Sequence, residues 1–425
     1  MTPQDSSFVN ACELATQAIR ELFAPTPLQL NLHLSEKFGA EIYLKREDLT
    51  PVRSYKLRGA YNFFRKALAA NGPAAGLARP RFVCASAGNH AQGFAFACQH
   101  FGVGGVVFMP VTTPQQKIDK TRAFGGDKVE IRLFGDFFDQ CNQAALDHAR
   151  DSAAIMVPPF DHPDIIEGQA SVALELLAQC PKAIDLLILP VGGGGLAAGV
   201  CQIMAARAPA TRIVFAEPEG APSFTQSLRH GKRVKLARVD NFVDGAAVAQ
   251  IGAANFEILK QRAADDVLLI SEDRLCETII EMLNIEGVVL EPAGALQIEA
   301  LRALPAADLK GKTVVCVTSG GNFDFERLPE VKERALKAAG LKKYYILRLP
   351  QRPGALRDFL GLLGPEDDIA RFEYLKKSAR NFGSILLGVE TKQPKNFDDL
   401  NRNMTEAGFI YRDITHDQDV ADILI

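Results

Sequence analysis

Residues 185–207 read DLLILPVGGGGLAAGVCQIMAAR, in which four glycines, Gly192 to Gly195, separate a continuous apolar run from a helical pattern. A continuous apolar run predicts a strand covered on both faces, as in a parallel sheet. Glycines let successive backbone N–H groups approach an anion closely, and the start of the following helix adds partial positive charge. A flexible connector is the alternative, but such linkers rarely follow a buried strand directly. The stretch therefore predicts an anion-binding loop, although it lacks the Lys-Ser/Thr of a P-loop and a clean GxGxxG.

Similar apolar runs alternate with longer helical patterns from about residue 80 to 330. This alternation is typical of parallel βα units. Because so many strands exceed one compact unit, we expect an α/β fold with two doubly wound lobes. The Pro/Gly-rich residues 71–81 are predicted to form an exposed connection. The predicted strands cover residues 81–85, 105–109, 129–133, 155–159, 185–191, 212–217, 266–271 and 313–318.

The pattern changes after about residue 341. The order of predicted elements becomes βαββαβ, which is the ferredoxin-like α+β arrangement. We expect a separate C-terminal module over residues 344–425, joined by a charged linker helix at 326–343. Its predicted strands cover 344–350, 371–377, 384–391 and 409–415, and its helices 353–364 and 398–408.

Composition excludes several classes of protein. The 425 residues carry a net charge of −3, which gives no electrostatic footprint for nucleic acid. No apolar run is long enough to cross a bilayer, and the first residues lack the features of a signal peptide, so we expect a cytoplasmic protein without membrane contact. Eight scattered cysteines and seven histidines show no metal-ligand spacing. We expect reduced, mostly buried cysteines and no metal.

Two further loops repeat the strand, loop, helix order. RFVCASAGNHAQG brings Ser86, Gly88, Asn89 and His90 to the end of one strand, and TVVCVTSGGN brings Ser319 and its neighbours to the end of another. Ligands of open α/β sheets bind outside the carboxyl ends of the strands. A helix N-cap by Ser86 or Asn89 explains the first loop equally well.

Lys56 lies in PVRSYKLRGA, residues 51–60, close to Arg53 and Arg58. A solvated basic patch is the ordinary interpretation of such a stretch. The alternative is a nucleophilic lysine, since neighbouring cations and partial desolvation lower the pKa of an amine. The stretch alone leaves both interpretations open.

Taken in order, these motifs resemble a known family. The match runs from about Thr26 to Asn322 through KREDLTPVRSYKLRGA, SAGNHAQG, VGGGGLAAG, AEPEGA, VDGAAV, EPAGA and VTSGGN. The chain is similar to the pyridoxal-phosphate enzymes of fold type II, which have the tryptophan-synthase-β fold. Within that family it resembles the threonine/serine dehydratase branch. The C-terminal module resembles the single ACT-like regulatory domain of short biosynthetic threonine dehydratases.

The resemblance implies a role for each matching residue. Lys56 becomes the catalytic lysine that forms a Schiff base with pyridoxal 5'-phosphate. The other implied cofactor contacts are the phosphate loop of Gly192, Gly193, Gly194, Gly195 and Leu196, Asn89 at the ring hydroxyl, and Ser319 at the pyridine nitrogen. The implied substrate contacts are Ser86, Ala87, Gly88, Asn89, His90 and Glu291.

The implied reaction is β-elimination of L-threonine to 2-oxobutanoate and ammonia, the first step of isoleucine biosynthesis. Related racemases carry a serine where this chain has Ala87, so racemisation is not expected. Their divalent-cation site uses an aspartate where this chain has Ser223, which argues against a magnesium site. A broader serine/threonine dehydratase and a non-catalytic amino-acid sensor are the alternative functions.

The resemblance also implies a domain organisation and a regulator. The catalytic domain would cover residues 1–325, with a large lobe at about 1–60 and 155–325 and a small lobe at about 61–154. Isoleucine is the implied feedback inhibitor and valine its antagonist, in a homotetramer. The effector is expected to contact the C-terminal module at Arg352, Gly354, Ala355, Phe372 and Tyr374, although a structural turn and core aromatic side chains explain these residues equally well.

Overall fold

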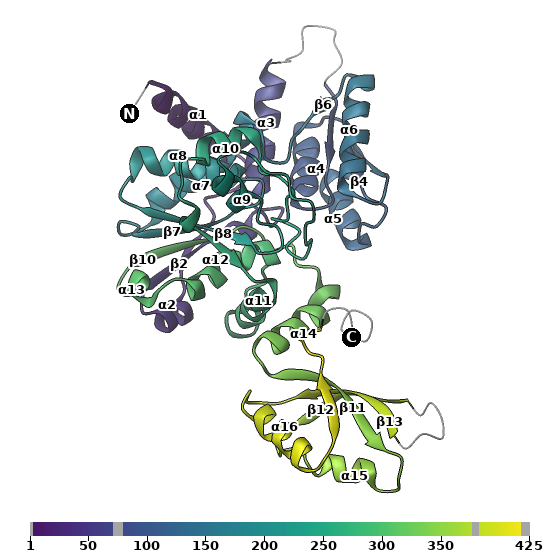
Figure 1. The fold of residues 1–425 in the computed structure, drawn as a ribbon. Helices are drawn as coiled ribbons and strands as arrows, with labels where there is room; N and C mark the ends of the chain where they lie inside the picture. The colour runs from purple at the N-terminus through teal and green to yellow at the C-terminus, as the bar shows by residue number, and fades with distance from the viewer. Residues whose placement is uncertain (1–2, 71–79, 376–381, 418–425) are drawn as a thin grey trace. The chain divides into compact units, whose positions relative to one another are not determined.

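The computed structural model describes residues 3–70, 80–375 and 382–417. Most of the connection predicted at 71–81 therefore lies outside the described residues. The chain divides into two compact units, Met1–Asp324 and Phe325–Ile425 (Figure 1). Each unit has its own sheets and apolar core.

The first unit contains a six-stranded sheet in the order β1-β2-β10-β7-β8-β9. All neighbours run parallel except β1, which is antiparallel to β2. The carboxyl ends of the parallel strands therefore share one edge, where the glycine loop follows β7 and the Ser319 loop follows β10. The bounds are β1 Leu28–Leu30, β2 Glu41–Arg46, β7 Leu186–Pro190, β8 Arg212–Pro218, β9 Val267–Ile270 and β10 Thr313–Thr318.

A second sheet of this unit has the order β5-β4-β3-β6, and all its pairs are parallel. The two parallel sheets confirm the expected α/β fold with two lobes. Strand β6 is shorter than predicted, and it pairs with β3, so these residues belong with the smaller lobe rather than the larger one. The bounds are β3 Phe82–Ala85, β4 Gly105–Met109, β5 Val129–Leu133 and β6 Ile155–Met156.

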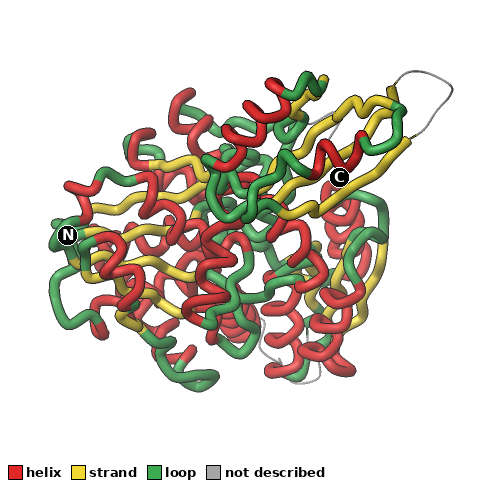
Figure 2. Tube along the Cα trace, turned by 90° about the horizontal axis from the view of Figure 1, so that it is seen from below, coloured by secondary structure: helices red, strands yellow, loops and turns green. Residues whose placement is uncertain are grey.

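Helices flank both sheets of the first unit (Figure 2). Helices α7 and α8 contribute more buried residues to the apolar core on the larger sheet than the other helices do, and Phe215 and Leu189 from its strands are fully buried. The helices are α1 Pro3–Ile19, α2 Leu32–Phe38, α3 Lys56–Ala70, α4 Asn89–Phe101, α5 Gln115–Gly125, α6 Phe138–Ser152, α7 Pro163–Gln179, α8 Gly195–Arg207, α9 Ser223–His230, α10 Ala253–Leu259, α11 Glu272–Glu286, α12 Pro292–Ala303 and α13 Ala306–Leu309.

The second unit confirms the ferredoxin-like order βαββαβ, with an antiparallel sheet β12-β13-β11-β14. Helix α15 begins at Ala355, later than the predicted 353, because Gly354, at φ +82°, takes a left-handed conformation that helix geometry excludes. It also ends at Leu360, before the predicted 364. Likewise the linker helix ends at Ala338, before Gly340 at φ +68°. The elements are α14 Leu328–Ala338, β11 Lys342–Pro350, α15 Ala355–Leu360, β12 Asp368–Leu375, β13 Phe382–Glu390, α16 Asn396–Glu406 and β14 Ile410–Asp413.

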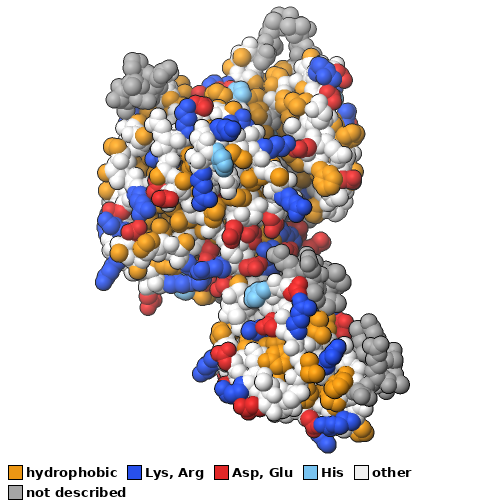
Figure 3. Space-filling view, viewed as in Figure 1, with side chains coloured by type: hydrophobic (Ala, Val, Ile, Leu, Met, Phe, Trp, Pro, Cys, Tyr) orange, Lys and Arg blue, Asp and Glu red, His pale blue; other side chains and the backbone are white. Residues whose placement is uncertain are grey.

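The surface and the cysteines agree with the composition. On the face in Figure 3, positive and negative side chains are interspersed over the first unit. All eight cysteines are free thiols and seven are buried, as expected. Within the described ranges, no helix combines the length and apolarity that a bilayer span needs.

Candidate active site

Lys56 is the first residue of α3 and its side chain is partly buried. Its Nζ donates a hydrogen bond to the main-chain oxygen of Pro159, 2.9 Å away, and lies 5.7 Å from the ring centre of Phe160. Burial lowers the pKa of Lys56 to about 8, and the carboxyl of Glu291 opposes this shift. The amine can therefore be neutral near physiological pH, as a nucleophile requires.

The glycine loop lies against the same segment as Lys56. A Cβ at Gly193 would stand 2.3 Å from ring carbons of Phe160, and a Cβ at Gly195 would stand 2.9 Å from the Phe160 main-chain oxygen. Gly194 caps α8 at φ +87°. Larger residues would therefore fill this space, and the first N–H groups of α8 have no partner within the helix. Phe160 therefore lies between the Lys56 amine and the glycine loop, which is suited to bind a phosphate.

Asn89 begins α4 at the carboxyl end of β3. Its Nδ2 donates to Glu291 Oε1 at 2.6 Å, while its Oδ1 accepts from Asn322 Nδ2 at 2.8 Å. Burial, followed by the nearby carboxylate of Asp244, raises the pKa of Glu291 to about 8. Three loops that are far apart in the sequence therefore meet through Asn89.

The remaining predicted residues line the same region. Ser319 is buried, and its Oγ donates a hydrogen bond to the main-chain oxygen of Ala293 at 3.0 Å. The main-chain oxygen of Ser319 accepts from the N–H of Tyr55 at 3.1 Å, and Tyr55 directly precedes Lys56. His90 is buried, with Nε2 3.0 Å from the Val157 oxygen. Burial and the Lys56 amine lower the pKa of His90 to about 3, which keeps its imidazole neutral.

Ser86, Ala87 and Gly88 form the turn between β3 and α4. The Gly88 N–H donates to Ser86 Oγ at 3.2 Å, and Gly88 is the N-cap of α4 without a side-chain bond. Neither Ser86 nor Asn89 is the N-cap residue, so the simple capping interpretation of this loop is wrong.

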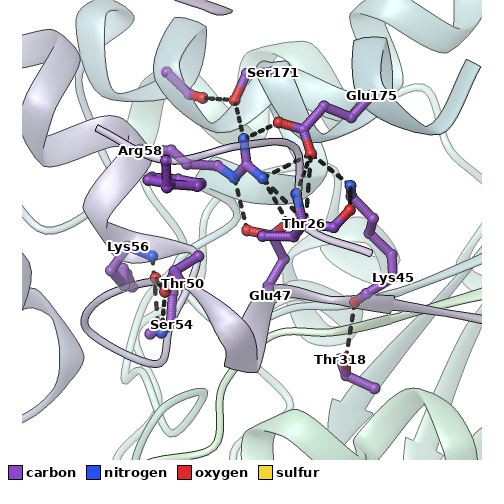
Figure 4. Close-up of polar contacts among 12 residues, drawn as sticks. Thr26, Lys45, Glu47, Thr50, Ser54, Lys56, Arg58, Ser171, Glu175 and Thr318 are labelled. Atoms are coloured by element: carbon purple, nitrogen blue, oxygen red, sulfur yellow. Dashed lines mark hydrogen bonds and ion pairs between the residues drawn. The ribbon is translucent and has the colours of Figure 1, made fainter. Parts of the chain in front are cut away.

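A buried ionic cluster surrounds Arg58, two residues after Lys56 (Figure 4). Arg58 is fully buried and donates to Glu47 and Glu175, each at 2.7 Å, and to the hydroxyls of Thr26 and Ser171. Lys45 also bonds Glu175. The solvated-patch interpretation is therefore wrong for Arg58, because its guanidinium is enclosed and paired. Arg53, by contrast, is exposed.

The residues present fit pyridoxal phosphate. They include an amine with a lowered pKa, a glycine loop at the start of α8 and a buried hydroxyl at Ser319. An aldehyde needs a neutral amine, a phosphate suits helix N-terminal N–H groups, and a ring nitrogen can be met by a hydroxyl.

Glu217, near the end of β8, uses its carboxylate to hold the start of α9. Both oxygens of Glu217 accept hydrogen bonds from the start of α9, from the N–H groups of Phe224 at 2.6 Å and Thr225 at 2.9 Å. Among the described residues, no group of three or more His, Cys, Asp or Glu side chains is arranged to hold a metal ion.

In the second unit, a hollow of about 410 Å³ opens between β11, α15 and β12. The five residues expected at the effector site all line it, together with Leu349, Pro350, Gln351, Pro353 and Leu356. The ring of Tyr374 covers Gly383, where a Cβ would stand 2.4 Å from it. Arg352 is held by Asp358 at 2.6 Å.

Two residues of the site were not predicted from the sequence. Phe160 lies against both Lys56 and the glycine loop, and the carboxylate of Asp244 helps to raise the pKa of Glu291. Phe160 carries no local signal, because it follows a short strand in an irregular segment. Asp244 belongs to the VDGAAV motif of the family resemblance, which implies no role for its carboxylate.

Comparisons with known proteins agree with this site. The family of pyridoxal-phosphate dependent enzymes matches residues 19–320, and the C-terminal regulatory domain of threonine dehydratase matches residues 333–424. A biosynthetic L-threonine dehydratase of Halalkalibacterium halodurans is 42% identical over 416 residues, covering 97% of this chain and 98% of the relative. That of Bacillus subtilis is 44% identical over 412 residues, covering 97% and 96%.

Among solved structures, the processed form of threonine deaminase isoform 2 from Solanum lycopersicum is similar with a TM-score of 0.72. It is 37% identical in sequence, and the match covers 79% of this chain and 94% of that one. The chain therefore belongs to the pyridoxal-phosphate dependent enzymes and, among them, to the threonine dehydratase family with a C-terminal regulatory domain.

Proposed function

We propose that this protein is a lyase that converts L-threonine to 2-oxobutanoate and ammonia with pyridoxal 5'-phosphate, as the first step of isoleucine biosynthesis. The observation that carries this function is the Lys56 amine. Its pKa is lowered to about 8, and Phe160 connects it to a glycine loop suited to a phosphate. Near full-length identity of 42–44% to biosynthetic L-threonine dehydratases supports the choice of substrate.

Bound pyridoxal phosphate would supply an electron-withdrawing ring beside the α-carbon of the substrate. Lys56 would hold its aldehyde, and the loop from Gly192 to Leu196 its phosphate. Asn89 would bond the ring hydroxyl and Ser319 the ring nitrogen.

Substrate handling would fall to the loop between β3 and α4. The turn from Ser86 to His90 opens α4, where N–H groups are suited to a carboxylate. Lys56 Nζ would take the α-proton and would return a proton to the departing hydroxyl. Ser319 is a neutral group, so it would leave the ring nitrogen largely unprotonated and favour prompt elimination.

The direct test is the formation of 2-oxo acid from L-threonine and from L-serine by the full-length protein loaded with pyridoxal phosphate. We expect turnover of L-threonine with the higher kcat/KM. Comparable values for the two substrates would favour the broader serine/threonine dehydratase. No turnover with either would favour an amino-acid sensor and overturn the proposal.

We further propose that isoleucine binds the hollow of the second unit and inhibits the enzyme, with valine as antagonist. The hollow combines apolar walls from Leu349, Phe372 and Tyr374 with the charged Arg352. An aliphatic amino acid needs this combination of an apolar surface and a group that meets its carboxylate.

Replacing Tyr374 with alanine removes one wall of the hollow. We expect the isoleucine concentration for half-inhibition to rise about 2- to 10-fold with unchanged basal turnover. Ile410→Ala is the matched control, since Ile410 is similarly exposed on β14 and does not line the hollow. Equal effects of both variants would reject this binding site.

Regulation through a separate unit requires two states with different effector affinity, and subunit contacts commonly express them. We therefore propose a homotetramer. Sedimentation velocity with and without isoleucine would test it, because a protein that stays monomeric under both conditions contradicts the proposal.

A further inference from the structure

Asn322 ends the VTSGGN segment after β10 and lies beside the site without being among its predicted contacts. Its Nδ2 makes two hydrogen bonds. One goes to the main-chain oxygen of Val52 and one to Asn89 Oδ1, each at 2.8 Å. Asn89 Nδ2 in turn donates to Glu291 Oε1 at 2.6 Å. The side chains of Asn322, Asn89 and Glu291 are thus linked in a row by hydrogen bonds, and a backbone carbonyl accepts the bond at the Asn322 end.

The direction of these hydrogen bonds is set at Val52. A main-chain carbonyl only accepts hydrogen bonds, so the atom of Asn322 that faces it must be the NH₂ group. The same NH₂ group faces Asn89, so the atom that Asn89 presents to it must be the carbonyl oxygen. The Asn89 NH₂ group is then left to face Glu291 and the interior of the site.

Glu291 could not fix this direction by itself. With a pKa raised to about 8, its carboxyl retains a proton at neutral pH and can either accept from an NH₂ group or donate to a carbonyl. Both orientations of the Asn89 amide are therefore compatible with Glu291. Only one of them is compatible with Asn322 held by Val52.

We propose that Asn322 is a positioning residue that locks the orientation of the Asn89 amide and aims its second N–H at the ring oxygen of the cofactor. One hydrogen of Asn89 Nδ2 serves Glu291, and the other remains for an acceptor. A turned amide would present a carbonyl to the same ring oxygen and repel it. This inference rests on the proposed function, in which Asn89 contacts the ring hydroxyl.

Two substitutions separate orientation from ordinary packing. Asn322→Ala removes the lock and leaves Asn89 free to turn either way. Asn322→Asp keeps the shape, but at pH 8 its carboxylate only accepts, so it would hold the Asn89 NH₂ group toward itself and away from the ring. We therefore expect the nearly isosteric variant to be the worse one, whereas a packing role would make alanine worse.

The measurement is fluorescence titration of the apo proteins with pyridoxal phosphate at pH 8, together with the absorption spectrum of the bound cofactor. We expect the Kd to rise about 2- to 5-fold for Asn322→Ala and about 10- to 100-fold for Asn322→Asp, with a changed spectrum in the latter. A Kd for Asn322→Asp equal to or below that for Asn322→Ala would overturn the inference.

A double-mutant cycle with Asn89→Ala checks that the effect passes through Asn89 and not through the added charge. Without the Asn89 amide, Asn322→Asp should weaken cofactor binding by less than 2-fold further. An undiminished effect would show that charge alone is responsible and would reject the inference. These readouts need no turnover, so a wild-type protein that binds cofactor but leaves L-threonine intact would sink the proposed function separately.

Discussion

Lys56 and Arg58 lie two residues apart at the start of α3, yet only Arg58 is bonded to carboxylates. Arg58 is fully buried and bonded to the carboxylates of Glu47 and Glu175. Lys56 Nζ bonds a neutral main-chain oxygen, and the ion pairs of the described residues do not include it. Two cationic side chains in one turn of helix thus differ in their partners: Arg58 has carboxylates and Lys56 has a neutral oxygen.

The difference teaches what makes an amine reactive here. Pairing with carboxylates favours the charged form of a cation, whereas burial favours the neutral form of an amine. Burial accordingly lowers the pKa of Lys56 to about 8. Burial lowers the pKa of Lys45 to about 7 even though Glu175 meets its amine, so Lys56 is set apart by its bond to a neutral oxygen beside the glycine loop. Arg58 instead connects α3 to η1, at Glu47–Leu49, and to α7, and so fixes the helix that carries Lys56.

Replacement of Lys56 by alanine should have the largest effect of all. We expect turnover of L-threonine to fall about 10⁴-fold or more, because the group that holds the cofactor and moves the α-proton is gone. The assay is 2-oxo acid formation at saturating pyridoxal phosphate. Lys56→Arg is the matched control: it keeps the charge but cannot become neutral, so a turnover near wild type would refute the role of a neutral amine.

Arg58→Met should instead unfold the protein more easily. Removing the guanidinium leaves Glu47 and Glu175 buried with fewer partners, which costs about 3–5 kcal/mol in the free energy of unfolding. Urea denaturation of the apo protein measures this cost. Arg53→Met is the control, since Arg53 is exposed and should change stability by less than about 0.5 kcal/mol. Equal losses for the two variants would remove the contrast on which this comparison rests.

The strands could be predicted because buried parallel strands are continuous apolar runs, as in Leu186–Pro190 and Thr313–Thr318. Strand β2 was missed, since its sequence EIYLKR ends in two charges. Lys45 can lie in that strand only because Glu175, 130 residues away, meets its amine. Such a long-range pair leaves no local signal.

The candidate site shows the same limit. The glycine loop and Asn89 were predicted because each follows a strand or begins a helix, whereas the role of Lys56 was predicted only through the family resemblance. The sequence could not show that Arg58 is paired, because Glu175 lies 117 residues away on α7. It also could not place Phe160 between the amine and the loop.

A smaller effect is expected in the pH dependence of cofactor uptake, which tests whether the pKa of the Lys56 amine is lowered. Only the neutral amine attacks an aldehyde, so the rate at which apo protein takes up pyridoxal phosphate should rise with pH and level off above about 8. Below that pH it should fall about tenfold per pH unit. Stopped-flow absorbance measures the rate. A rise that continues to pH 10 would mean that the Lys56 amine has an ordinary pKa.

Ser171→Ala should have the smallest effect. Ser171 Oγ accepts from Arg58 Nη1 at 3.0 Å, while both carboxylates remain in place, so the free energy of unfolding should fall by about 1 kcal/mol. Thermal unfolding gives the value. A loss as large as that of Arg58→Met would mean that the hydroxyl, rather than the carboxylates, holds the guanidinium.

The most direct test of the account is to find which side chain holds the cofactor. Borohydride reduction of the protein loaded with pyridoxal phosphate makes the covalent attachment permanent, and peptide mass mapping then locates it. We predict a single pyridoxyl group on Lys56 and none on Lys45, which is buried in the ionic cluster. A label on any other lysine, or no label on a protein that turns over L-threonine, would contradict the account.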